Sequence, residues 1–192
     1  DLETVPSFAE TVPASTLALV AGRDLGQSWA IDQLQTVLLS ALAGSLLGAD
    51  FDLTDIDPAT QFGVISMLTG IDFRADLFDQ LTGDWGLALL TIDTQDPLQS
   101  SVVLSSELAD PDRVSVAVTS LGPLIQSSGA GTASVTTSSI DDQTVTNVAL
   151  QSPIEATLQY GVVDDQLMIG LGNGIEDIAT PPQDPLAGDA EY

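Results

Sequence analysis

The chain has 192 residues, 44% hydrophobic and 16% charged, and its 28 acidic against 3 basic residues give a formal net charge of -25. It contains no lysine, histidine or cysteine, which excludes disulfides, zinc–thiolate sites, imidazole catalysis and Schiff-base lysines within the chain. Nucleic acids and anionic membrane surfaces are bound mainly by cationic side chains, so these partners are excluded as well. The charge favours cations or positively charged partners.

The first part of the chain predicts an extended lead-in, one strand and one long helix. Residues 1–15 carry two prolines and little periodicity, and Thr16–Gly22 is a short apolar run that ends at a glycine, typical of a buried strand. Ser28–Leu47 predicts the long N-terminal helix, because its apolar residues recur at three- and four-residue steps. The stripe consists of Ile31, Leu34, Leu38, Leu42 and Leu46.

The middle of the chain changes from helical to strand patterns. Phe73–Leu81 predicts a short helical segment, and Trp85–Ile92 and Ser101–Ser106 predict two strands of a hairpin. Asp110 followed by Pro111 predicts a helix start, with aspartate as the N-cap and proline at the first helical position.

That helix has an apolar stripe of its own and one internal breaker. The stripe is Val114, Val118, Leu121 and Ile125. The dipeptide Gly122-Pro123 interrupts it, and because proline has no N–H, we expect it to kink or shorten the helix.

The last third predicts four antiparallel strands and a short helix. Two acidic pairs, Asp141-Asp142 and Asp164-Asp165, stand where tight turns are expected. Asn173 is placed to cap a final helix over Gly174–Ala179. The four strand candidates are Ala133–Ser138, Gln143–Leu150, Ile154–Val162 and Gln166–Leu171.

Together these elements predict an α+β fold: a largely antiparallel sheet with helices packed on one face. We expect a single module over residues 16–180. The proline-rich residues 181–192 are expected to form a linker toward a further module.

The order of several short patterns resembles a known bacterial family. These patterns are PASTLAL, GIDFRADLFDQLTGDWGLAL, VVLSSELADPDRV, YGVVDDQLMIG and the tail DPLAGDAEY. They resemble the domain of unknown function 3352, over about Pro13 to Tyr192. The resemblance implies an exported or membrane-anchored protein with similar modules in tandem. The family has no established activity, so the resemblance carries over no functional residue.

Four aspartates after the predicted long helix, Asp50, Asp52, Asp55 and Asp57, are the best candidates for binding chemistry. Calcium takes about six to eight oxygen ligands, which clustered carboxylates can supply. The EF-hand pattern fails, however, because Asp55 stands where glycine is required and Gln61 where the bidentate glutamate belongs. We expect a solvated, helix-capping loop rather than a metal site.

Catalytic signatures are weak throughout. Paired carboxylates serve glycosidases, but among 28 acids some pairs meet by chance. Serine has neither a G-x-S-x-G elbow nor a customary base. The run GLGNG at Gly170–Gly174 lacks the third glycine of a dinucleotide loop, and Glu176 and Asp177 would repel phosphate, so a strand-to-helix turn is expected. We predict no enzyme, no catalytic residue and no cofactor.

We expect the tryptophans and arginines to stabilise the fold rather than to form a binding site. Trp29 and Trp85 stand in apolar stretches and are expected to be core anchors. Arg23, Arg74 and Arg113 are scarce cations among acids, so each is expected to pair with a carboxylate.

The sequence therefore predicts a non-enzymatic, exported bacterial module with a structural or binding role. Its extracytoplasmic location is favoured by the many serines, threonines and glutamines and by the lack of cysteine. The partners expected are an apolar ligand, a cationic partner or a neighbouring module of the same polypeptide. The alternative is a calcium-dependent adhesion domain that uses the acidic loop.

Overall fold

The computed structural model describes residues 7–27, 60, 63, 66–67, 69–95, 100–128, 133–140, 142–150 and 156–179. The predicted long helix over Ser28–Leu47 and the predicted linker over residues 181–192 lie outside these residues.

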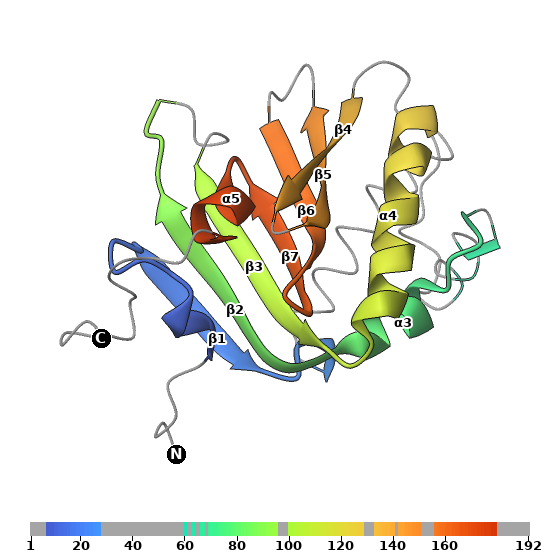
Figure 1. Cartoon of the computed structure of the whole chain (residues 1–192), viewed down its shortest axis with the longest axis horizontal. Coiled ribbons are helices and arrows are strands. Elements are labelled where there is room, and N and C mark those ends of the chain that lie inside the picture. Colours follow the sequence, from blue (N-terminus) through green and yellow to red (C-terminus); the bar gives the residue numbers. More distant parts are fainter. Residues whose placement is uncertain are drawn as a thin grey trace.

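The described core is one seven-stranded sheet in which every neighbouring pair is antiparallel (Figure 1). The strand order is β1-β2-β3-β7-β6-β5-β4. The strands are β1 (Ala18–Arg23), β2 (Leu81–Thr91), β3 (Ser101–Leu108), β4 (Ala133–Ile140), β5 (Gln143–Leu150), β6 (Ala156–Val163) and β7 (Gln166–Leu171).

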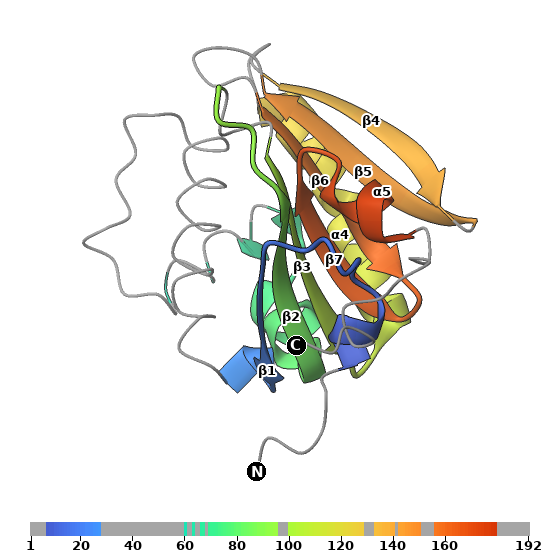
Figure 2. The same cartoon turned by 90° about the vertical axis from the view of Figure 1, so that its left-hand side faces the viewer.

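The sheet consists of two meanders joined at its centre. β1, β2 and β3 follow one another across one half, and β7 to β4 fill the other half in reverse order of the chain. Helix α4 (Pro111–Ser128) connects the two, and β3 pairs with β7 from Val102↔Leu171 to Glu107↔Gln166. Between β3 and β4 the chain therefore passes from the centre of the sheet to its outer edge, and β5, β6 and β7 bring it back to the centre (Figure 2).

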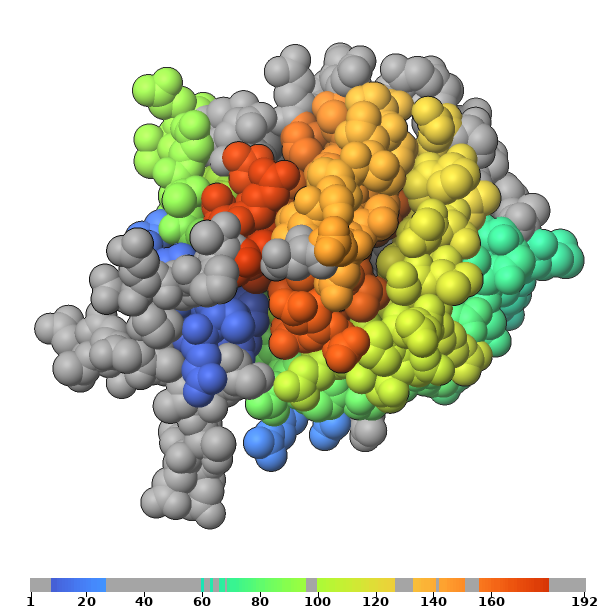
Figure 3. Space-filling view, in the orientation of Figure 1, coloured from blue at the N-terminus to red at the C-terminus, as the bar shows by residue number. Residues whose placement is uncertain are grey.

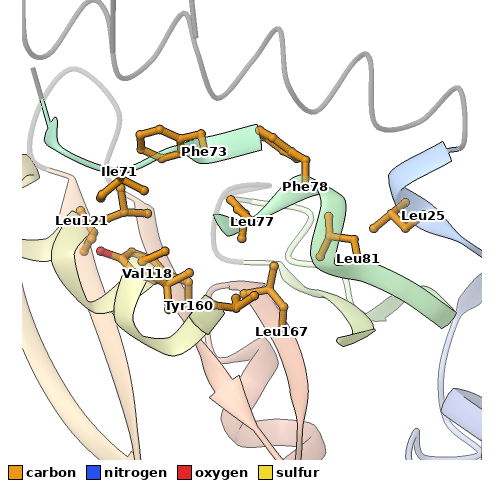
Figure 4. Close-up of a cluster of buried hydrophobic side chains, with 13 residues drawn as sticks. Leu25, Ile71, Phe73, Leu77, Phe78, Leu81, Val118, Leu121, Tyr160 and Leu167 are labelled. Carbon is orange, nitrogen blue, oxygen red and sulfur yellow. The ribbon is translucent and has the colours of Figure 1, made fainter. Parts of the chain in front are cut away.

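One face of the sheet is covered by α4, by the short helix α3 (Phe73–Asp76) and by the 3-10 turns η2 (Leu25–Gln27) and η3 (Phe78–Gln80). The predicted stripe of α4 supplies Val114, Val118 and Leu121, all buried in this cluster. The sheet contributes Tyr160 and Leu167 to the same core (Figure 4). Apolar packing between a helical stripe and a sheet holds this face together.

The opposite face is covered as well, which corrects the prediction that helices pack on one face only. Helix α5 (Gly174–Ala179) lies in front of β3 and β7 (Figure 1), where Ile175 and Ile178 pack with Val103 and Met168. Adjacent strand residues point to opposite faces. The largely buried strands β3 and β7 therefore carry apolar side chains on both faces, and both need a cover.

The second cover includes part of the predicted lead-in. The 3-10 helix η1 (Ser7–Glu10) places Phe8 at 2% exposure, and Val12 is fully buried in the same cluster. Phe8 lies against the backbone of β2 at Gly86, where any Cβ would collide with the Phe8 ring. Residues 7–12 are therefore part of the folded core.

The predicted turns and the final helix are confirmed. Asp164 and Asp165 both have positive φ, 50° and 62°, as a two-residue turn between antiparallel strands requires. The turn also receives a bond from its neighbour, because the Asp164 N–H donates to Gln143 Oε1 at 2.7 Å.

The run GLGNG is a strand-to-helix turn, as predicted. It joins β7 to α5, and a Cβ on Gly174 would collide with the Val102 carbonyl oxygen. The glycine therefore permits close packing of α5 on β3.

Helix α4 begins as predicted but does not end early. It continues through Pro123 to Ser128. Proline cannot donate to the carbonyl of Thr119 one turn earlier. Both residues are exposed, so water can satisfy that carbonyl and the helix tolerates the breaker.

Candidate binding cleft between α3 and α4

One wall of the cleft is the N-terminus of α3, where two aspartate side chains accept hydrogen bonds from backbone N–H groups. The Ala75 N–H donates to Asp72 Oδ1 at 3.1 Å, and the Asp72 N–H donates to Asp76 Oδ2 at 2.9 Å. Each side chain thus satisfies a backbone donor that a helix start leaves unpaired. The bond from the Asp72 N–H holds the Asp76 carboxylate on the side of α3 that faces α4.

The start of α4 supplies the opposite wall. The Arg113 N–H donates to Asp110 Oδ1 at 3.1 Å, the N-cap contact that the Asp110-Pro111 pair predicts. The cap holds the first turn of α4 in register. Arg113, Val116, Ala117 and Ser120 of this helix line the cleft.

One ion pair bridges the two walls. Arg113 Nε lies 2.7 Å and Nη2 lies 2.6 Å from the same oxygen, Asp76 Oδ1. The side chains are 46% and 26% exposed, so water screens the pair and it contributes at most about 1 kcal/mol. Because a guanidinium has five N–H donors, this arrangement leaves others available to a ligand.

Between these walls lies a cavity of about 360 Å³. Its lining joins the ion pair to three apolar side chains, Ile71, Val116 and Ala117, and to the hydroxyl residues Thr69 and Ser120. Val116 is 70% exposed, although it is aliphatic. Figure 3 shows α4, in yellow, beside the teal and green segment around α3 on the surface.

The hydroxyls of the cleft already have backbone partners. Ser120 Oγ donates to the Val116 carbonyl at 2.8 Å, and Thr69 Oγ1 accepts from the Ile71 N–H at 3.2 Å. The guanidinium of Arg113 is consequently the polar group best placed to contact a ligand there, and Ile71, Val116 and Ala117 offer apolar surface.

The four aspartates predicted as candidate ligands, Asp50, Asp52, Asp55 and Asp57, lie outside the described residues, as does Trp29. Within the part of the chain that the structure describes, no group of three or more acidic residues is arranged to hold a metal ion. Trp85 is partly buried against the α4-side core, as predicted.

The arginine predictions are confirmed for two of three residues. Arg23 Nε lies 2.9 Å from Asp84 Oδ1, and Arg113 pairs with Asp76. Arg74 forms no ion pair with a described carboxylate, although it stands two positions from Asp76 in the sequence. On a helix, residues two apart do not face each other, which explains why Asp76 is paired from α4.

Sequence reasoning missed the cleft because its walls come from two separate helices. The motif Asp110-Pro111 locates the start of α4, and Asp76 stands in a recognisable short helical segment. Their proximity, however, depends on how both helices pack on the sheet, and no spacing in the chain encodes that.

Comparison with known proteins identifies the family. The profile described as "Protein of unknown function (DUF3352)" matches residues 2–192, essentially the whole chain. The chain therefore belongs to this family. No curated protein and no solved structure matches it. In the described part of the chain, none of the helices combines the length and the apolar character that crossing a membrane requires.

Proposed function

We propose that this chain is a non-enzymatic binding module whose ligand occupies the α3–α4 cleft. The observation that supports this most directly is the cleft itself, where a half-exposed guanidinium stands beside three apolar side chains in a cavity of about 360 Å³. Small-molecule sites are typically concave and apolar, with few polar groups to orient the ligand.

The use of the acidic side chains supports binding over catalysis. In the described residues, several carboxylates that face the protein bond its backbone or hydroxyls: Glu107 accepts from the Asp84 N–H, and Asp177 accepts from Ser101 Oγ. The cleft carboxylate, Asp76, is bound by Arg113 and by the Asp72 N–H. Both oxygens of this carboxylate are thus used to join α3 to α4 and to cap α3, which is a structural role.

The ligand that fits this cleft is a small, uncharged, largely apolar molecule with one carbonyl group. The apolar walls favour the body of such a molecule, and the guanidinium donates to the carbonyl. Arg113 and Asp76 neutralise each other at the cleft, so neither a carboxylate nor an ammonium group finds an unpaired opposite charge among the described lining residues.

NMR titration of the 15N-labelled chain with hexanamide, hexanoate and hexylammonium tests this proposal. Hexanamide is expected to shift the backbone signals of Gly70, Ile71, Ala117 and Ser120. Arg113→Met should weaken its binding about tenfold. Arg23→Met removes an ion pair elsewhere and is the matched control, so it should leave binding unchanged. Absence of shifts at about 20 mM hexanamide, or equal binding by Arg113→Met, would contradict the proposal.

We also propose that the module works outside the cytoplasm, in an exported or membrane-anchored bacterial protein. The composition supports this location, since the chain has no cysteine and is rich in serine and threonine. Protease added to intact bacteria should digest the tagged full-length protein while a cytoplasmic marker stays intact. Equal protection of both proteins would contradict this location.

A further inference from the structure

The outer strand β4 lacks the protections that edge strands usually carry. In the described part of the chain β4 pairs only with β5, and it forms one end of the sheet (Figure 2). Its eight residues, ASVTTSSI, include no charge and no proline. The pairing with β5 runs without a bulge from Ala133↔Leu150 to Ile140↔Gln143. Charges, prolines and bulges are the common means of blocking an edge, so β4 can accept another strand.

The hairpin geometry shows which backbone groups are available. Ile140 pairs with Gln143 across a two-residue connection, and residues that flank such a turn form a hydrogen-bonded pair. Hydrogen-bonded and non-bonded pairs then alternate along the strand. The N–H and C=O groups that point away from β5 therefore belong to Ala133, Val135, Thr137 and Ser139.

We propose that two copies of this chain associate by antiparallel pairing of their β4 strands, with Thr136 opposite the same residue of the second copy. This register places Val135 opposite Thr137 and Ala133 opposite Ser139, so the outward groups of one strand meet those of the other. All facing side chains are small or β-branched and uncharged, a favourable combination for cross-strand pairs. Thr136 and Thr137 are exposed and accessible for this contact.

The distribution of charge makes β4 the edge at which two copies can meet. The acidic turn lies at one end of β4, so antiparallel pairing separates the two turns. In this register the two copies of Asp142 lie roughly 40 Å apart, far beyond the Debye length of about 8 Å at physiological salt. At the other end of the sheet, β1 ends on the exposed Arg23–Asp84 ion pair, which places charge on that edge.

The proposed dimer is weak and depends on salt. One strand from each copy buries little surface, which is typical of transient contacts. The overall repulsion between two chains of net charge -25 opposes association and falls as salt screens it. Higher ionic strength should therefore tighten the dimer, whereas it would weaken an association driven by opposite charges.

Sedimentation equilibrium of the purified chain, at about 0.01–1 mM in 20 and 500 mM NaCl, tests the proposal. We expect a reversible dimer whose Kd falls at least about threefold at the higher salt. Thr137→Pro removes an outward N–H but no β4–β5 hydrogen bond, and should weaken association about tenfold or more. Thr137→Val retains the N–H at the same position and should dimerise like the unmodified chain.

Several results would overturn the proposal. One is a monomer at 1 mM in 500 mM NaCl, and another is unchanged dimerisation of Thr137→Pro. If Thr137→Pro melts at a lower temperature than the unmodified chain, Thr136→Asp is used in its place. This substitution at an exposed position places the carboxylates of the two copies opposite each other, so it should also prevent the dimer. A dimer that Thr136→Asp leaves intact and Val20→Asp, on the exposed surface of β1, abolishes would assign the interface to β1 and would equally overturn the proposal.

Discussion

The two faces of the sheet are held to their covers by different interactions. On the α4 face, a long helix with an apolar stripe packs on apolar strand residues such as Val148 and Leu167. On the α5 face, a helix of six residues is held by two isoleucines and by polar contacts. The Ile175 N–H donates to Gln159 Oε1 at 3.3 Å, and the Gln159 side chain is buried at 3% exposure.

Gln159 belongs to a row of amides and hydroxyls on the α5 face. Its Nε2 donates to Asn147 Oδ1 at 2.9 Å, and Asn147 Nδ2 donates to Ser138 Oγ at 3.0 Å. Nearby, Ser105 Oγ donates to Gln166 Oε1. A short helix buries too little apolar surface to fix its own position, so directional hydrogen bonds specify where α5 lies. We therefore expect substitutions on the two faces to change the stability of the protein by different amounts.

The largest effect is expected from the α4 face. Phe73 is 1% exposed in its core, so Phe73→Ala should lower the free energy of unfolding by about 3–5 kcal/mol, through lost burial and the cavity it leaves. Urea denaturation followed by circular dichroism measures this. A loss below about 1.5 kcal/mol would show that the core on the α4 face is packed too loosely for apolar burial to hold the helices on it.

A pH-dependent effect of intermediate size is specific to the α4 face. Burial raises the pKa of Tyr160 to about 12, and the Thr146 side chain lowers it in part. An unfolded tyrosine has a pKa of about 10, so below pH 10 both states are protonated and stability is unaffected. Between pH 10 and 12 the unfolded state loses its proton first, and the unfolding free energy should fall by about 2 kcal/mol.

Tyr160→Phe isolates this contribution. Other groups titrate in both proteins, so the difference between the two chains in unfolding free energy, measured at pH 9 and at pH 12, reports Tyr160 alone. An identical decline in both proteins would contradict the buried position of the hydroxyl.

The smallest effect is expected on the α5 face and depends on hydrogen bonds. Gln159→Leu keeps a similar volume but leaves the Ile175 N–H and Asn147 Oδ1 without this partner, at a cost of about 1–2 kcal/mol. Amide hydrogen exchange should show the loss of protection concentrated in α5. Gln126→Leu, at an exposed position of α4, is the control and should stay within about 0.5 kcal/mol. Uniform loss of protection across the sheet would contradict a local role for Gln159.

Much of the described fold could be predicted from local patterns. The strands from Trp85 onward alternate or form short apolar runs, the Asp110-Pro111 pair starts α4, and the acidic pairs predict the turns. Each of these depends on neighbouring residues alone. The final helix over Gly174–Ala179 was predicted, but the face that it covers was not, because six residues carry too few apolar positions to show on which side a helix packs. The 3-10 helix η1 was missed altogether for the same reason.

The candidate cleft and the open edge of β4 could not be predicted from local patterns either. Arg113 was expected to pair with a carboxylate, and the partner, Asp76, lies 37 positions away in the chain. The sequence of β4 shows an uncharged strand, but only the strand order β1-β2-β3-β7-β6-β5-β4 makes it an edge.

By itself, the amino-acid sequence determined the antiparallel α+β class, the family and the exclusion of cysteine, histidine and lysine chemistry, since these depend on composition and on short-range pattern. The tertiary structure decided which strand lies at the end of the sheet, which helix covers which face, and that α3 and α4 enclose a cavity. Such relations join residues far apart in the chain. They follow from the packing of whole elements, to which many side chains contribute small energies together.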